Sequence, residues 1–464
     1  MDIVFLGHQT VLLERDGTRI LVDPVFRPRL AAERAAIFPP KTIEIDALLP
    51  IAAVVLSHTH LDHLDGEALD AINKDALVFV STLSYGRIAP HLATLGFDPG
   101  RVIPLQPTGQ VRVGPFRVGA AKFGRLSNEF GLGEPDVTPV VVRDADDVVL
   151  NFIDLFPDHP REVHAIGPVS AIITAWNYTH SRGEIAQGPV DPSTLADSLS
   201  DGLAGLFDTL GVPNVLMVGN GFVLEEQYAG YNAHMFPVTR EAVCAAANLR
   251  CQRAQFSALE EGRRYRLSKG VLEQGDRVPW YRPTASDLSQ TYDAKAPAPQ
   301  GRLPFLGDAP LDDGALARVE SFLDDTYRHW LQFRYLTQYF FAGLVVNGAY
   351  HEGLGLKLTS RTGPPLCYRF LRSPKGVAFL DAEPAELSTC HVVVEITAQD
   401  FLGLMDGDIV LIDPVYYDVH PTQSFLANLP VPATPVLREP LGVFDPFYHD
   451  VAVARALGID KADG

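Results

Sequence analysis

The chain has 464 residues, of which 47% are hydrophobic and 20% charged, and its formal net charge is −19. This composition is typical of a soluble globular protein with two or three domains. Nucleic-acid phosphates are bound by clustered Lys and Arg, so the negative charge argues against a nucleic-acid partner. Four cysteines without close pairs do not make a disulfide framework, and no basic and apolar leader opens the sequence. We therefore expect a cytoplasmic protein.

The first half of the chain alternates strand-like and helix-like segments. Ala52–Leu56 is apolar throughout, which indicates a strand buried on both faces, and a helix pattern follows from Gly66 to Ile72. Further strands are predicted at Ile3–Leu6, Thr10–Glu14, Arg19–Val22, Ala76–Val80, Val111–Val113, Phe116–Val118, Val140–Val142, Val148–Phe152, Val169–Trp176 and Val215–Val218. This mixture predicts an α/β fold in which two sheets pack between helices.

Composition changes near Val278, where prolines become frequent and apolar periodicity is lost. We expect a catalytic domain over residues 1–275, a Pro-rich linker or ordered loop over 276–313, and a smaller α+β domain over 314–464 that covers the pocket. Ala315–Val346 is predicted to be helical. Its apolar part, Tyr335–Val346, is shorter than the ~20 residues that span a bilayer, so we expect a core helix and no integral membrane segment. Strands of the second domain are predicted at Leu356–Leu358, Cys367–Leu371, Val377–Leu380 and His391–Ile396.

The segment after the strand Ala52–Leu56 gathers three imidazoles and a carboxylate within six residues. These are His58, His60, Asp62 and His63. Imidazole and carboxylate together suit zinc, iron or manganese. On a loop that leaves a buried strand, His58 and His60 can face one ion while Asp62 and His63 face a second. The sequence therefore predicts that all four are metal ligands.

This HxHxDH segment resembles the motif of the metallo-β-lactamase-fold superfamily. Two upstream features also match that family, Gly7-His8 and the segment that ends in Asp23-Pro24. The resemblance implies an αββα sandwich over roughly residues 1–260. It also implies that Asp23 supports the metal loop without binding metal, and we expect His8 to be structural and close to the pocket.

The superfamily also implies ligands further along the chain. A carboxylate that bridges two metals is expected at a strand end, and Asp154 fits, 91 residues after His63. Hydrolases of the family place a histidine about 60 residues after the motif, where this chain has Lys122. The nearest candidates are acidic, and Glu129 has the best spacing, with Glu134 and Asp136 as alternatives. A carboxylate here makes the site harder and more anionic, which suits iron.

A last histidine ligand is expected near a later strand end. His234 is the preferred candidate, with His180, Glu225 and Glu226 as alternatives. Glu129 and Asp154 are thus predicted to belong to the catalytic centre, together with the metal ligands of the motif and His234.

Two groups of hydroxylases resemble this chain more specifically. One is the metallo-β-lactamase-fold diiron hydroxylases of natural-product biosynthesis, in which a Glu fills the place proposed for Glu129. The other is the CMP-N-acetylneuraminate hydroxylases, whose resemblance lies in four segments: Leu56–Leu64, Val149–Asp154, Val169–Trp176 and Asn214–Glu226. Those enzymes also carry a Rieske domain, which needs two Cys-and-His groups. This chain has only Cys390-His391, so their substrate is not implied.

Two functions follow from these patterns. The favoured hypothesis is a nonheme diiron monooxygenase with two Fe ions. It would hydroxylate a C–H bond of a small molecule, such as a diterpenoid natural product, with O2 and electrons from a separate protein or reductant. The alternative is a hydrolase with one or two Zn ions, whose metal-bound water attacks an ester, lactone or phosphodiester.

Overall fold

The computed structural model describes most of the chain in separate stretches. The described residues are 1–30, 35–58, 62–82, 84–106, 109–121, 137–153, 160–175, 185, 188–219, 221–284, 292–299, 306–331, 343–346, 348–406 and 418–421.

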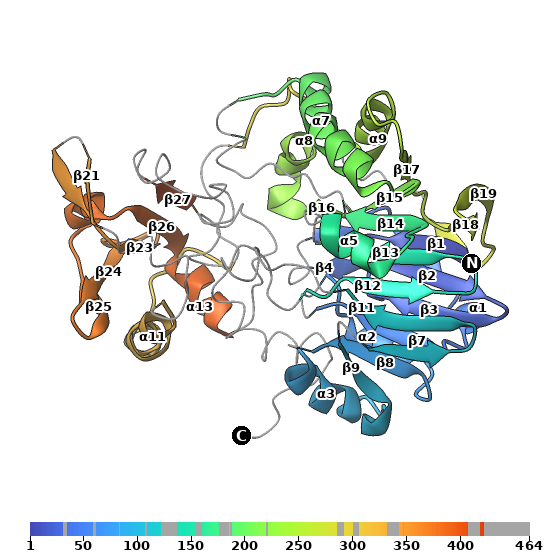
Figure 1. The fold of residues 1–464 in the computed structure, drawn as a ribbon. Helices are drawn as coiled ribbons and strands as arrows, with labels where there is room; N and C mark the ends of the chain where they lie inside the picture. The colour runs from blue at the N-terminus through green and yellow to red at the C-terminus, as the bar shows by residue number, and fades with distance from the viewer. Residues whose placement is uncertain are drawn as a thin grey trace.

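Two large sheets form the N-terminal part (Figure 1). Within the described residues, the first has the order β19-β18-β1-β2-β3-β7-β8-β9. Neighbours are antiparallel from β19 to β3 and parallel from β3 to β9. Its strands are β1 (Asp2–Gly7), β2 (Thr10–Arg15), β3 (Thr18–Val22), β7 (Ala53–Leu56), β8 (Leu77–Ser81), β9 (Val102–Leu105), β18 (Arg263–Ser268) and β19 (Val271–Arg277).

The second sheet has the order β10-β11-β12-β13-β14-β15-β17 over the same described stretches. It is antiparallel from β10 to β13 and parallel from β13 to β17. Its strands are β10 (Gln110–Val113), β11 (Phe116–Ala120), β12 (Val140–Arg143), β13 (Val148–Asn151), β14 (Ala171–Ala175), β15 (Asn214–Val218) and β17 (Gln255–Ala258).

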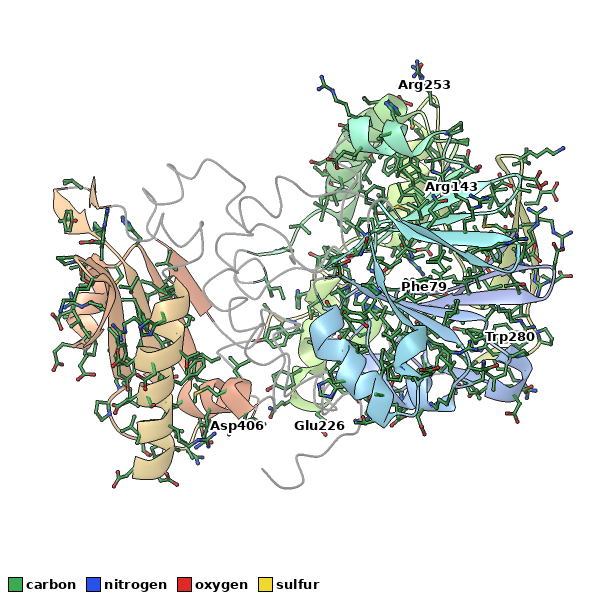
Figure 2. The ribbon with its side chains drawn as sticks, turned by 60° about the horizontal axis from the view of Figure 1, so that its bottom comes forward. Phe79, Arg143, Glu226, Arg253, Trp280 and Asp406 are labelled. Carbon is green, nitrogen blue, oxygen red and sulfur yellow. The ribbon has the colours of Figure 1, made fainter. Side chains whose placement is uncertain are left out.

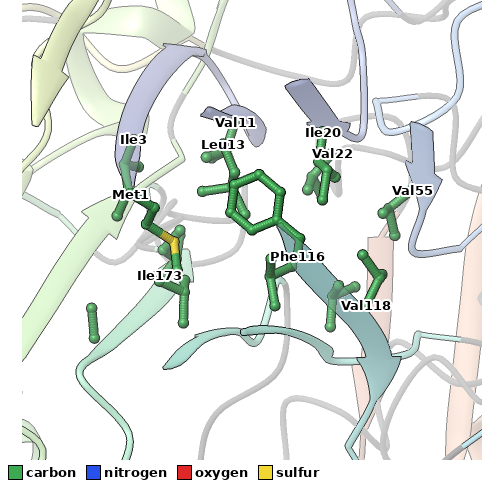
Figure 3. Close-up of a cluster of buried hydrophobic side chains, with 14 of the residues drawn as sticks. Met1, Ile3, Val11, Leu13, Ile20, Val22, Val55, Phe116, Val118 and Ile173 are labelled. Carbon is green, nitrogen blue, oxygen red and sulfur yellow. The ribbon is translucent and has the colours of Figure 1, made fainter. Parts of the chain in front are cut away.

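Alternating side chains of β1 show how the layers are built. Ile3 and Phe5 point into the cluster between the two sheets, where Phe116 from β11 is fully buried (Figure 3). Val4 and Leu6 point to the opposite face, into a second cluster under helices α2 and α3. A third cluster lies between the second sheet and helices α5, α7 and α9. These three apolar layers produce an αββα sandwich, as predicted, because each sheet is buried on both faces.

Helices and short strands complete the N-terminal part. The short strands form two small pairings, β4 (Arg29–Leu30), β5 (Ala35–Ile37) and β16 (Phe222–Leu224) in one, and β6 (Lys41–Ile43) with β20 (Tyr281–Pro283) in the other. The helices are α1 (Ile45–Leu48), α2 (Gly66–Ala71), α3 (Tyr85–Thr94), η1 (Pro99–Arg101), α5 (Pro160–Ile166), α7 (Pro192–Leu210), η2 (Glu226–Tyr231), α8 (Asn232–Met235) and α9 (Arg240–Asn248). Because β20 pairs with β6, the chain still belongs to this part at Pro283, beyond residue 275.

The C-terminal part is a smaller α+β unit around a sheet of order β25-β24-β23-β26-β27 (Figure 1). Its elements are α10 (Asp313–Ser321), η3 (Phe322–Tyr327), α11 (Arg328–Leu331), β21 (Leu344–Val346), β22 (Ala349–His351), β23 (Leu354–Thr359), β24 (Leu366–Ser373), β25 (Gly376–Asp381), η4 (Pro384–Thr389), β26 (Val392–Thr397), α13 (Ala398–Asp406) and β27 (Asp418–Pro421). The prediction of helix as far as Val346 was wrong at its end. Leu344–Val346 is a strand, because it forms an antiparallel hairpin with β22.

One buried apolar cluster contains side chains from both parts of the chain. Tyr228, Tyr231 and Met235 come from the N-terminal part, and Tyr327 and Phe370 from the C-terminal part. In Figure 2, Phe79 lies inside the sandwich, whereas Glu226 lies on the side turned toward the C-terminal sheet. No helix among the described residues combines the length and apolarity needed to cross a membrane.

Candidate metal centre

The predicted metal loop lies where the ends of several strands meet. The loop after β15 contacts the end of β1, because the Gly219 N–H donates to the His8 carbonyl at 2.9 Å. The start of β12 contacts the end of β7, because the Thr138 N–H donates to the Ser57 carbonyl at 3.2 Å. These two bonds join the two sheets at one edge. Side chains that leave β1, β7, β12 and β15 there share a common space.

Two histidines of the motif are buried next to each other. His58 and His63 are both 0% exposed, and their ring centroids lie 4.2 Å apart. The Nδ1 atom of His58 lies 2.8 Å from the Ser57 hydroxyl oxygen. His60, between them in sequence, lies outside the described residues.

Asp23 supports this loop from the end of β3. Its backbone has a positive φ of 43°, and its carboxylate is fully buried. One oxygen accepts from the Ser57 N–H at 2.8 Å, and the other accepts from the Ser57 hydroxyl at 2.7 Å. The second oxygen also lies 3.0 Å from Nδ1 of His63. This contact favours the tautomer that leaves Nε2 of His63 as the ligand atom. Asp23 thus occupies the supporting position that the sequence suggested.

Asp65 fixes the other end of the motif. Its carboxylate caps α2 by accepting from the Glu67 N–H at 3.0 Å. The same side chain accepts from the N–H groups of Phe26 and Arg27 at 2.6 and 2.8 Å. The segment after β3 is therefore tied to the residues that follow His63.

Asp62 lies between two imidazoles. Its Oδ2 atom is 2.9 Å from Nε2 of His8 and 3.5 Å from Nε2 of His63. Burial alone would raise the pKa of Asp62, but the charges and hydrogen bonds of His63 and His8 outweigh it and hold that pKa well below its ordinary value. The side chain is therefore a carboxylate, the form that binds metal.

The described residues fit a divalent metal ion. The candidate ligand atoms of His8, Asp62 and His63 all lie within 4.8 Å of one another. Metal bonds to imidazole nitrogen and carboxylate oxygen are roughly 2.0–2.2 Å long, so two ligands of a tetrahedral ion lie about 3.4 Å apart. The 3.5 Å separation between Asp62 Oδ2 and His63 Nε2 matches that spacing. This pair could hold one ion without rearrangement.

His8 lies close to the metal loop, as expected from Gly7-His8. Its contact with Asp62 was not predicted. The structure places its ring against Asp62, with a 5.6 Å separation between the His8 and His63 ring centroids. The signal was present, but the contact depends on β1 and the motif loop meeting in space, which no local pattern shows.

Several predicted ligands lie outside the described residues. They are Glu129, Glu134, Asp136, Asp154 and His180. The described residue before Asp154 is Ile153, which is buried at the end of β13 and has a positive φ of 58°. Asp154 itself lies outside the described residues, and its bridging role stays a prediction.

His234 is described but lies apart from the three-residue cluster. It lies on α8, is 6% exposed, and its ring is edge-on to Tyr292 at 6.4 Å. Among the described residues, its Nε2 atom has no hydrogen-bond partner. Of the alternatives, Glu225 forms an ion pair with Arg29 at 3.0 Å. The assignment of His234 as a ligand stays a prediction.

Comparison with known proteins finds one matching family model and several partial relatives. Residues 18–141 match the model of the beta-lactamase superfamily domain. An uncharacterized protein of Mycobacterium tuberculosis is 31% identical over 135 residues, which are 28% of this chain and 35% of that protein. This chain thus matches about a third of the length of that curated relative.

Two solved structures share 17–19% identity with this chain. CmlA, a diiron beta-hydroxylase from Streptomyces venezuelae, is 19% identical, with a TM-score of 0.36 over 59% of this chain and 54% of that one. A possible metal-dependent hydrolase from Veillonella parvula is 17% identical, with a TM-score of 0.41 over 57% and 98%. The family match includes β3, β7 and the HxHxDH loop, which is the segment that carries the buried histidines. Over residues 18–141, the chain is therefore similar to the beta-lactamase superfamily domain.

Proposed function

We propose that this protein is a nonheme diiron monooxygenase that hydroxylates a C–H bond of a small molecule. In this proposal His58, His60 and Glu129 hold one iron, and Asp62, His63 and His234 hold the other. Asp154 bridges the two. The bound irons would supply O2 activation, with electrons from a separate protein or reductant.

The observation that supports this proposal is the sequence between β11 and β12, together with the described residues that flank it. The Ala121 N–H donates to the Pro139 carbonyl at 2.9 Å, and the Thr138 N–H donates to the carbonyl of Ser57, next to His58. The described residues on either side of 122–136 therefore lie beside the metal loop. The intervening sequence contains no histidine, but it contains Glu129 and two further acidic residues. A ligand from this segment must then be a carboxylate.

The charge of such a site favours iron over zinc. Glu129 would join Asp62 and Asp154 as a third negative ligand around two cations, with the buried carboxylate of Asp23 behind them. Anionic oxygen ligands stabilise the higher oxidation states that oxygen activation requires, and they make zinc-bound water a weaker acid. The zinc hydrolase is the alternative that the experiments below must exclude.

The protein's own residues have defined tasks in this proposal. Asp23 and Ser57 hold the imidazoles of His63 and His58 in fixed orientations through their Nδ1 atoms. The depressed pKa of Asp62 keeps that ligand ionised at neutral pH. The C-terminal domain is proposed to cover the pocket and keep bulk water away from the reacting C–H bond.

Metal content and oxygen uptake test the proposal together. The full chain is produced with both iron and zinc supplied, its bound metals are measured, and the iron form is reduced with dithionite under nitrogen before O2 is admitted. We expect two irons per chain and rapid O2-dependent reoxidation. With a library of small molecules and labelled O2, we expect a hydroxylated product that carries one labelled oxygen atom.

A single substitution sharpens the test. Glu129→His should shift metal preference toward zinc and abolish O2 uptake, whereas Glu134→His on the same segment is the matched control and should leave both unchanged. If the zinc-loaded protein hydrolyses an ester, lactone or phosphodiester without O2, and the iron form incorporates no labelled oxygen, the oxygenase proposal is wrong.

A further inference from the structure

His8 occupies an unfavourable backbone conformation at the turn from β1 to β2. Its φ is +51°, and the preceding Gly7 has a φ of +99°. A residue other than glycine at positive φ is strained and persists only where its surroundings impose it. The register of β1 against β2 also shifts between Phe5 and Gly7. The turn is therefore strained, and this strained conformation sets the direction of the His8 side chain.

The loop after β15 holds His8 from the other side. The Gly219 N–H donates to the His8 carbonyl at 2.9 Å. Gly221 packs so closely that a Cβ atom built there would lie 2.4 Å from the His8 Cβ. Any larger residue at position 221 would have to displace His8. Two elements far apart in sequence thus fix this imidazole in position.

The ring of His8 has one side-chain hydrogen bond among the described residues. Its Nε2 atom lies 2.9 Å from Oδ2 of Asp62, and the side chain is 2% exposed. A carboxylate only accepts hydrogen bonds, so Nε2 carries the proton and donates. The Nδ1 atom is buried without a hydrogen-bond partner in the described part of the chain.

The direction of the Asp62 carboxylate depends on its hydrogen bond to His8. It lies in a turn between β7 and α2, so no helix or strand sets the direction of its side chain. Its other imidazole neighbour is the candidate ligand His63, whose Nε2 lies 3.5 Å away. When a metal ion uses that Nε2, His8 is the described side chain that still directs the carboxylate.

We propose that His8 is a positioning residue that orients Asp62 toward the metal ion shared with His63. The proposal rests on the proposed metal centre but not on the reaction carried out there. His8 donates from Nε2 to one carboxylate oxygen, and it binds no metal itself. Outer-shell contacts of this kind typically change metal affinity 10- to 100-fold.

Metal titration of the full chain tests this role without substrate or O2. Zn²⁺, and Fe²⁺ under nitrogen, are titrated into metal-free protein in competition with a chromophoric chelator, which gives both affinity and stoichiometry. For His8→Ala we expect the affinity of one ion to fall about 10- to 100-fold, with the stoichiometry at saturating metal unchanged.

Three further variants separate the explanations. His8→Gln keeps a donor near the position of Nε2 and should recover most of the lost affinity. Gly221→Ala keeps the imidazole of His8 but shifts its position, so it should lower the affinity for the same ion. His164→Ala is the matched control, because His164 contacts the Leu210 carbonyl at 3.1 Å, away from the motif, and it should bind metal as the parent does.

Two results would overturn the proposal. If His8→Ala and His8→Gln both lose one ion even at saturating metal, His8 is a ligand and not a positioning residue. If His8→Ala binds both ions with the parent affinity, the contact has no role in metal binding. Thermal unfolding of the metal-free variants identifies any variant that fails to fold. If Gly221→Ala fails to fold, the comparison of His8→Ala with His8→Gln still decides the question. A failure of the oxygenase proposal would leave these titrations unaffected.

Discussion

Each part of the chain contains a pair of neighbouring histidines, and the two pairs differ in their surroundings. In the sandwich, the ring centroids of His58 and His63 are 4.2 Å apart. The Asp23 carboxylate contacts both His63 and the Ser57 hydroxyl that supports His58. In the C-terminal part, His351 and His391 stack with 6.4 Å between ring centroids.

The difference lies in the carboxylates. Over the described residues, the group of three possible metal ligands that lie close together is His8, Asp62 and His63, and none comes from the C-terminal part. Cys390, beside His391, has a thiol whose pKa burial raises to about 12, so it is not a ready thiolate ligand. In the sandwich, one buried carboxylate orients His63 and a second lies at ligand spacing from its Nε2 atom.

The largest expected difference is between two variants, each of which lacks one histidine of one pair. His63→Ala should lose at least one metal ion and reduce turnover at least a hundredfold, because water does not replace an oriented imidazole and Asp23 loses a partner. His351→Ala should keep the full metal content and activity. Metal analysis and turnover of both purified variants check this comparison, and a His63→Ala protein that retains both metals would contradict the assignment.

A second experiment asks whether the two parts depend on each other. Phe370 is fully buried in the C-terminal sheet, with its ring 5.0 Å from that of Tyr327. Phe370→Ala should destabilise this part by about 3–5 kcal/mol through the cavity it leaves. We expect the metal content to stay unchanged, because the ligands lie in the other part. Denaturant unfolding measures the loss of stability, and metal analysis measures the bound ions. Leu249→Ala, at an exposed position, is the control. Loss of metal from Phe370→Ala would indicate a ligand from the C-terminal part.

The smallest expected effect concerns one lysine in each part. Burial lowers the pKa of Lys41 to about 8, although Glu261 and Asp65 oppose the shift. Between pH 8 and 10.5 the unfolded chain binds more protons at this position than the folded one, so Lys41 adds a rise in stability with pH across that window. Lys41→Met should remove that contribution, which is about 3 kcal/mol across the window. Lys357→Met is the control: it removes a lysine paired with Glu395 at 3.0 Å and should keep the rise in stability with pH. Urea unfolding from pH 7.5 to 10.5 measures how the stability of each variant changes with pH.

Much of the sandwich could be predicted because its signals are local. Ala53–Leu56 and Val148–Asn151 are short apolar runs, and each became a buried strand close to its predicted bounds. The metal motif was equally visible, since its four candidate ligands lie within six residues. Leu344–Val346 was misassigned because an apolar run of that length has no periodicity that separates a strand from a helix.

What could not be predicted depends on residues that are distant in sequence. Nothing in Phe222–Leu224 indicates that it pairs with Ala35–Ile37, and nothing near His8 indicates Asp62 as its partner. The pairing registers and this contact arise only when the sheets close on each other. Glycines at 219 and 221 gave a partial signal, because two glycines so close together often mark a close approach of backbone.

The pairing of β1 with β18 has a consequence for how the protein is made. Asp2 lies opposite Arg266, a separation of 264 residues, so β1 leaves the ribosome long before its partner strand β18. At roughly 5–20 residues per second, the interval lasts many seconds. During it, one edge of an apolar strand has unpaired backbone groups that a neighbouring chain can bind. A strand pairing of such high sequence separation is expected to slow the folding of this sheet.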